Sequence, residues 1–136
     1  MATHARLYVH LVWSTWDRLP LVSPGQEARL AFALETKCLE IGCDPLAIGV
    51  MPDHVHVLVR IPPTAVISTL VKELKGSSSH LMTHVIAPGN FFKWQGYYGA
   101  FSLAQQDVGR VQSYVREQKQ HHRNGTSESC WEECDA

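Results

Sequence analysis

The sequence has no long apolar segment and no excess of positive charge. No stretch approaches the ~20 consecutive apolar residues that a membrane-spanning helix requires, and the first residues lead into a strand-like pattern rather than a secretory leader. The 136-residue chain carries a net charge of −1, whereas a nucleic-acid-binding domain is typically basic. These absences argue against a membrane or secreted protein, and we expect a cytoplasmic one.

The common cofactor motifs are also missing. No glycine-rich loop of the P-loop kind is present, so nothing indicates nucleotide hydrolysis. The four cysteines match no common zinc or redox spacing, and reduced thiols are the simplest interpretation. A metal clip near the C-terminus, built from the last two cysteines and His121-His122, is a weaker alternative. The cysteines are Cys38, Cys43, Cys130 and Cys134.

Charge is distributed unevenly along the chain. All 12 Lys and Arg lie within residues 1–123, where 9 acidic residues oppose them, and the other 4 acidic residues lie in the last 13 positions. The apolar content of 45% is ordinary for a globular protein of this length. The sequence therefore predicts one domain over residues 1–123 and a flexible acidic tail over residues 124–136.

Apolar periodicity predicts seven elements in the order strand, helix, strand, strand, helix, strand, helix. Residues 6–15 are apolar on both strand faces, which is typical of a central strand. Ser23-Pro24-Gly25-Gln26 has the pattern of a capping box at the start of the first helix, and Gly42 ends that helix. Two strands, 45–50 and 54–60, are joined by a Pro52-Asp53 turn, so they are expected to pair in antiparallel fashion.

The second half of the chain is less regular. Apolar positions from Ile67 to Leu74 predict the second helix, which the segment 76–79 either ends or interrupts. Residues 91–103 are dense in aromatics and contain two glycines, so we expect a strand with a bend or bulge. Its aromatic side chains either fill the core, the commoner case, or stack on bases. Asp107 is a candidate cap for the last helix.

The most informative stretch is Met51-Pro52-Asp53-His54-Val55-His56-Val57-Leu58-Val59. Side chains alternate along a strand, so His54 and His56 share one face while the valines between and after them face the core. Two adjacent imidazoles can bind a divalent metal. By itself, a His-x-His pair is more often a pair of polar residues on a solvated sheet face.

The last predicted helix carries Tyr114 and Gln118 one turn apart, on a side next to the buried valines at 108, 111 and 115. That side can therefore face the sheet. His10, on the open face of the first strand, either supports the histidine pair or is simply packed in the core. Lys72 and Lys75, off the apolar stripe of the second helix, form a solvated face or contact phosphates.

Together these segments resemble the single-tyrosine transposases of the HUH nuclease superfamily, which act on single-stranded DNA in bacterial insertion sequences. The resemblance runs from the first strand to the last helix. It is carried by YVHLVWST at 8–15, MPDHVHVLV at 51–59, LKGSSSHL at 74–81, WQGYYGAFS at 94–102 and YVREQKQHH at 114–122.

The resemblance implies an α+β fold: a ferredoxin-like or RRM-like antiparallel sheet with helices on one face and a C-terminal helix bearing the tyrosine. It implies that His54, His56 and Gln118 bind a divalent metal and that Tyr114 is the nucleophile. Mg²⁺ or Mn²⁺ suits such a donor set. Lys72 and Lys75 become candidates for DNA contact.

The implied activity is cleavage and rejoining of single-stranded DNA at insertion-sequence ends through a 5′-phosphotyrosine intermediate. The implied partners are hairpin ends of DNA and a second copy of the chain, because in that family the tyrosine helix of one subunit can reach the other's metal site. Two alternatives stay open: a non-catalytic hairpin-binding module on the same fold, and a nuclease in which metal-bound water attacks. Tyr97 and Tyr98 are rival nucleophiles.

Overall fold

The computed structural model describes residues 4–118. A four-stranded antiparallel sheet forms its centre, with strands in the spatial order β2-β3-β1-β4. The strands are β1 (Leu7–Ser14), β2 (Asp44–Met51), β3 (His54–Ile61) and β4 (Gly99–Leu103). This strand order, with one helix after β1 and one after β3, is the ferredoxin-like arrangement, so the predicted fold class is confirmed.

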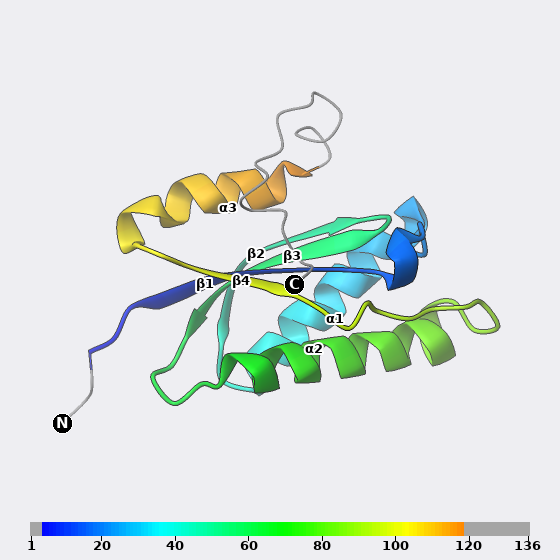
Figure 1. The fold of residues 1–136 in the computed structure, drawn as a ribbon, viewed down its shortest axis with the longest axis horizontal. Helices are drawn as coiled ribbons and strands as arrows, with labels where there is room; N and C mark the ends of the chain where they lie inside the picture. Colours follow the sequence, from blue (N-terminus) through cyan, green and yellow to red (C-terminus); the bar gives the residue numbers. More distant parts are fainter. Residues whose placement is uncertain (1–3, 119–136) are drawn as a thin grey trace.

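Within residues 4–118, three α-helices cover the sheet. Two lie on one face and one lies on the other (Figure 1). They are α1 (Glu27–Glu40), α2 (Ile67–Leu81) and α3 (Val108–Arg116). Helices α1 and α2 lie side by side beneath the sheet, whereas α3 crosses the opposite face. The predicted helix order and the predicted central position of the first strand are both correct.

The alternation of side chains along β3 separates two cores. Val55, Val57 and Val59 are buried in the large core, together with apolar side chains of α1 and α2. Leu58, on the other face, packs with side chains of α3 in a smaller core. The two histidines lie on the same face as Leu58, as the period of two predicts. Helix α3 therefore lies over the histidine face.

The first helix begins and ends as its sequence predicts. The backbone N–H of Ser23 donates to Oε1 of Gln26 at 3.0 Å, which is half of a capping box, and a short 3-10 turn leads into α1. At the other end, Gly42 has a φ of 82°, a left-handed conformation that glycine adopts without a Cβ clash. The chain then turns directly into β2.

The segment 76–79 does not end the second helix. Helix α2 runs through it to Leu81, and a π-helical turn, Met82–Ile86, follows. Ser78 is buried; its Oγ donates to the carbonyl of Leu74 at 2.6 Å and accepts from Nε1 of Trp94 at 2.9 Å. Because one bond within the helix and one from Trp94 satisfy this serine, it does not break the helix.

The strand predicted over 91–103 is shorter than expected. Only Gly99–Leu103 forms β4, and upstream of it Trp94 makes one isolated bridge with Thr15. Trp94 packs edge-on against Trp13, with ring centroids 5.9 Å apart, and against Phe92 at 4.8 Å. Phe92 and Trp94 fill the core, so core packing rather than strand pairing decides the backbone path of this segment.

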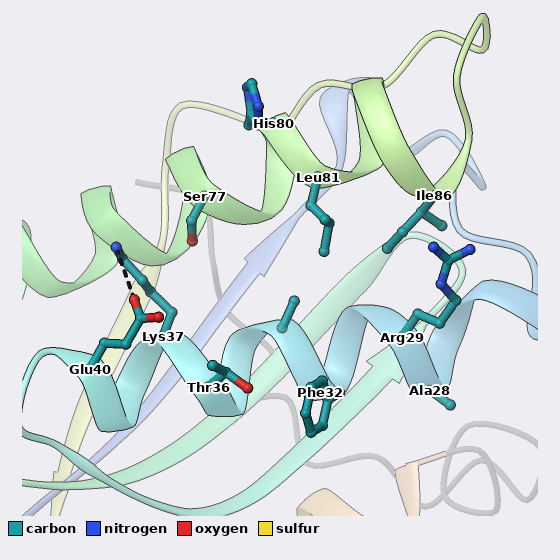
Figure 2. Close-up of a pocket in the computed structure, with 11 residues that line it drawn as sticks. Ala28, Arg29, Phe32, Thr36, Lys37, Glu40, Ser77, His80, Leu81 and Ile86 are labelled. Atoms are coloured by element: carbon teal, nitrogen blue, oxygen red, sulfur yellow. Dashed lines mark ion pairs between the residues drawn. The ribbon is translucent and has the colours of Figure 1, made fainter.

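A groove of about 610 Å³ lies between α1 and α2. Figure 2 shows Ser77 and Leu81 of α2 pointing toward α1, whose Phe32 and Thr36 also line the groove. Phe32 is 70% exposed at its rim. The groove lies on the sheet face opposite the histidine pair, so it is not part of the candidate site described below.

Two thiols lie in the described part of the chain, and both are free and buried. Burial raises the pKa of Cys38 to about 12, so this thiol stays protonated at neutral pH. Cys130, Cys134, the His121-His122 pair and the predicted tail at 124–136 fall outside residues 4–118. Within that range, no helix is long and apolar enough to cross a membrane.

Candidate metal and tyrosine site

His54 and His56 begin β3 and are both buried under α3. Their ring centroids are 5.1 Å apart and the rings are nearly perpendicular. The alternative of two solvated polar residues does not hold, since His54 is 4% exposed and His56 is fully covered. A buried imidazole pair needs a specific set of partners to offset its desolvation.

In each of the two rings, the Nδ1 atom contacts a side chain outside the histidine pair; we call this side chain the outer partner. Nδ1 of His54 lies 2.7 Å from Oδ1 of Asp53. We assign the proton to His54, because a carboxylate only accepts. The same hydrogen bond is the main cause that lowers the pKa of the Asp53 carboxyl. This assignment makes Nε2 of His54 the unprotonated nitrogen, the form that binds a metal in carboxylate–histidine–metal triads.

His56 has a histidine as its outer partner. Its Nδ1 lies 2.9 Å from Nε2 of His10, and the two rings are stacked at 5.1 Å with an interplanar angle of 20°. When His56 donates from Nδ1, its Nε2 lone pair faces away from His10. Of the two interpretations of His10, support of the histidine pair fits this contact better than plain core packing.

Tyr114 is buried on the sheet-facing side of α3. Its ring meets the ring of His56 edge-on, with centroids 6.1 Å apart and an interplanar angle of 78°. Val111 and Val115 hold the helix in this position by packing on Leu58 and Ala47. The predicted valine stripe is thus confirmed, and it brings the phenol to the histidine pair within one chain.

Gln118 lies one turn after the tyrosine and is almost fully buried. Its Nε2 donates to the backbone carbonyl of Tyr114 at 3.0 Å. The amide oxygen, Oε1, is thereby the atom with the chemistry to meet a cation. Asp107 occupies the N-cap position of α3, but its side chain makes no capping bond and lies 3.8 Å from Arg110.

Gly49 explains how α3 comes so close to the sheet, and the sequence analysis missed it. It sits opposite His56 on the neighbouring strand β2. A Cβ at this position would lie 2.4 Å from the carbonyl oxygen of Val115 and 3.0 Å from Cγ of Gln118. A glycine inside a strand pattern signals close backbone approach, and that signal was available in the sequence.

Replacing Gly49 by Ala should push α3 off the sheet, because the clash is with backbone rather than a flexible side chain. We expect a loss of about 1–3 kcal/mol in unfolding free energy from overpacking, and a larger loss of any activity that needs Tyr114 near His56. Thermal unfolding and activity assays measure the two effects.

The matched control is Gly76→Ala, in an open part of α2, where a Cβ meets nothing within 4 Å. It should stabilise the helix by about 0.5–1 kcal/mol. A Gly49→Ala variant as stable and active as the parent would show that the close approach is not needed.

The two lysines and the rival tyrosines are not gathered at this site. Lys75 Nζ donates to the backbone carbonyls of Gln95 at 2.5 Å and Tyr97 at 3.2 Å, so it anchors the loop before β4. Lys72 is exposed on α2, on the other side of the sheet. Tyr97 and Tyr98 are exposed.

The donors fit a divalent metal only in part. Among residues 4–118, His, Cys, Asp and Glu nowhere form a group of three that could hold an ion. Two imidazole nitrogens and the amide oxygen of Gln118 would leave open positions for water and a phosphate oxygen. Such a mixed set suits Mn²⁺ or Mg²⁺ with an exchangeable ligand, rather than a closed structural zinc site.

Comparison with known families identifies the protein class that this fold and site define. The sequence of residues 3–118, most of the chain, matches the protein family described as "Transposase IS200 like". The predicted resemblance to single-tyrosine transposases is therefore confirmed. The chain belongs to the IS200-like transposase family.

Individual relatives agree with this assignment. The ISDra2 transposase TnpA of Deinococcus radiodurans is 28% identical over 121 residues, which cover 83% of this chain and 84% of the relative. A crystal structure of a putative transposase from D. radiodurans R1 matches with a TM-score of 0.65 and 26% identity, over 87% of this chain and 95% of that one.

A third similar structure is a REP-associated tyrosine transposase bound to a REP hairpin. It matches with a TM-score of 0.64 over 93% of this chain and 76% of that one. At 16% identity, this likeness establishes the shared fold alone.

Proposed function

We propose that this transposase cleaves and rejoins single-stranded DNA at insertion-sequence ends through a 5′-phosphotyrosine intermediate. Tyr114 is the nucleophile, and His54, His56 and Gln118 hold a divalent metal, Mg²⁺ or Mn²⁺. The observation that carries the proposal is the burial of the Tyr114 phenol edge-on against His56, in a family of transposases. A tyrosine with only a packing role would not require this neighbour.

The reaction is balanced without an external energy source. The phenol of Tyr114 loses its proton and its oxygen attacks phosphorus, while the bond to the 3′ oxygen breaks and that oxygen takes up a proton. A divalent cation held by His54, His56 and Gln118 would supply charge neutralisation at the phosphate. Because the phosphodiester is exchanged for a phosphotyrosine, a later 3′ hydroxyl can reverse the step and rejoin the strands.

The protein's own residues prepare this exchange. Asp53 contacts Nδ1 of His54, and His10 contacts Nδ1 of His56, so each ligand ring is held in one orientation. Gln118 braces the last turn of α3 through the carbonyl of Tyr114. The packing of α3 on the sheet limits the movement of the phenol, which shortens the search for in-line geometry.

We also propose that the DNA partner ends in a hairpin and that the protein works as a homodimer. A relative of the same fold was solved with a REP hairpin, which supports a hairpin ligand here. The family resemblance supports the dimer. Light scattering after gel filtration tests it, with twice the 15.3 kDa chain mass expected.

Covalent capture tests the proposed activity directly. Single-stranded oligonucleotides are made for both strands of the DNA on either side of the gene that encodes this protein. They are incubated with the protein and Mn²⁺ and then run on a denaturing gel. The proposal predicts an adduct with one strand, and no adduct when EDTA is present. Cleavage without an adduct would favour a water nuclease, and binding without cleavage would favour a hairpin-binding module. Either result overturns the proposal.

His10 provides a prediction specific to the metal. Replacing it by Phe removes the outer partner of His56 but keeps a ring of similar size. We expect Mn²⁺ affinity to fall about 10- to 100-fold, the usual effect of losing such a partner, with partial rescue in His10→Gln. Calorimetric titration with Mn²⁺ measures this without any DNA.

DNA binding in EDTA should be unchanged in the His10→Phe variant, because that measurement does not involve the metal. Parent-like Mn²⁺ affinity in His10→Phe would mean that the 2.9 Å contact serves packing alone.

A further inference from the structure

A polar pocket of about 420 Å³ lies beside the candidate metal site. Its lining residues are Ser14, Asp17, Arg18, Gln95 and Tyr97. Ser14 is the register partner of His54 across β1 and β3, so both side chains lie on the same face of the sheet. The pocket is therefore next to His54, on the side toward β4.

One wall of this pocket is a strained turn. Asp17 and Arg18 have φ values of 52° and 50°, a left-handed conformation that is unfavourable for a non-glycine residue. Side-chain and backbone hydrogen bonds hold the turn: Asp17 N–H donates to Oε1 of Gln95 at 3.2 Å, Thr15 Oγ1 donates to the carbonyl of Leu19 at 2.6 Å, and Arg18 N–H donates to the carbonyl of Thr15 at 3.1 Å. Arg18 lies in this turn and lines the pocket.

The opposite wall is the loop at 95–97, and it is fixed to the sheet. Gln95 N–H donates to the carbonyl of Ser14 at 2.9 Å, and Lys75 holds the carbonyls of Gln95 and Tyr97 from below. The Tyr97 side chain is nevertheless 51% exposed. An aromatic ring on an anchored backbone, left open to solvent, is a preorganised stacking surface.

The charges at the pocket favour a nucleotide. The guanidinium of Arg18 contributes positive charge to the lining of the pocket. Nearby, Lys93 Nζ lies 4.1 Å from the ring centroid of Trp16. The carboxylate of Asp17 is on the same pocket and disfavours a second phosphate there. One phosphate and one neutral base match this arrangement.

We propose that this pocket binds one unpaired base next to the phosphate that is cut, with Tyr97 stacking on the base and Arg18 contacting its phosphate. The placement beside the cleaved phosphate depends on the proposed function, but the binding itself does not. In this role Tyr97 orients the strand as it enters the metal site. Tyr97, named above as a rival nucleophile, would then bind DNA rather than attack it.

The first test separates base stacking from charge. A labelled hexathymidylate is compared with a hexamer of abasic deoxyribose phosphates, by fluorescence anisotropy in EDTA at one fixed salt concentration. The parent should bind the base-containing hexamer about 5- to 100-fold more tightly than the abasic one. In Tyr97→Ala this ratio should approach one, and Tyr97→Trp should restore it.

The matched control is Tyr98→Ala, because Tyr98 is adjacent and exposed but does not line the pocket. It should keep the parent ratio. Arg18→Gln should weaken both hexamers by the same factor, since a phosphate contact is independent of the base. Equal ratios for the two tyrosine variants, or unchanged affinities in Arg18→Gln, would overturn the proposal.

A second test locates the base. Once a cleaved element end is known, an abasic residue is placed on either side of the cut phosphate. At one of these positions the parent should lose affinity while Tyr97→Ala loses little more, because both changes remove the same contact. Additive losses at both positions would place the base elsewhere. Failure here leaves adduct formation at Tyr114 unaffected, so the two proposals are tested separately.

Discussion

Tyr114→Phe is expected to form no covalent adduct with single-stranded DNA, and to keep its affinity for that DNA within about twofold. The adduct rate should fall by at least roughly 10³-fold, the usual scale for loss of a nucleophile. The phenyl ring can still pack edge-on against His56, because the substitution removes only the hydroxyl. Denaturing gels measure the adduct, and anisotropy measures the affinity.

The control for this experiment is Tyr98→Phe. The Tyr98 side chain is exposed and does not line the pocket beside His54, so this variant should form the adduct at near the parent rate. Adduct formation by Tyr114→Phe would assign the nucleophile to another residue.

His56→Ala should lose metal binding and, with it, cleavage. Removing one of two imidazole ligands should lower Mn²⁺ affinity by at least about 100-fold, because the change exceeds the effect of losing an outer partner alone. It also leaves the buried His10 ring without its 2.9 Å contact, and the unfolding free energy should fall by about 1–3 kcal/mol. Calorimetry with Mn²⁺ and thermal unfolding measure the two effects.

Two further variants separate the loss of stability from the loss of metal binding. His54→Ala should lose the metal in the same way, and its stability loss comes from a different contact, the 2.7 Å bond to Asp53. His80→Ala, an exposed histidine of α2 on the far groove, should change neither quantity. A His56→Ala protein that is folded and still cleaves DNA in a metal-dependent way would remove His56 from the site.

Much of the fold followed from the sequence because local signals agreed with tertiary packing. The alternation in His54–Val59 assigned opposite faces to the histidines and valines, and the valine spacing in α3 oriented Tyr114 toward the sheet. Both patterns hold because a single period decides which side chains are buried.

The sequence failed where burial came from distant partners. The segment 76–79 was expected to end or interrupt the second helix, but the Trp94 indole and the carbonyl of Leu74 satisfy Ser78 inside α2. The aromatic segment before β4 looked like a strand, but Trp94 is drawn into the core against Trp13. Neither contact can be inferred from spacing, because each joins residues that are far apart in the chain.

Part of the site could also be predicted from the sequence, because local spacing and motif resemblance identify its residues. Motif residues His54, His56, Tyr114 and Gln118 were identified from spacing and resemblance, and the structure brings them together. The outer partner Asp53 had been assigned only to a turn, and Gly49 was overlooked. Their roles depend on which atoms meet across strands and helices.

The most direct test of the account is to locate the DNA on the protein. After adduct formation and nuclease trimming, tryptic digestion separates the peptide at 111–116, which carries Tyr114, from the peptide at 94–110, which carries Tyr97 and Tyr98. Mass spectrometry should find the nucleotide phosphate on the first peptide, with fragmentation assigning it to the tyrosine. A nucleotide on the second peptide, or cleaved DNA with no modified peptide, would contradict the proposed chemistry.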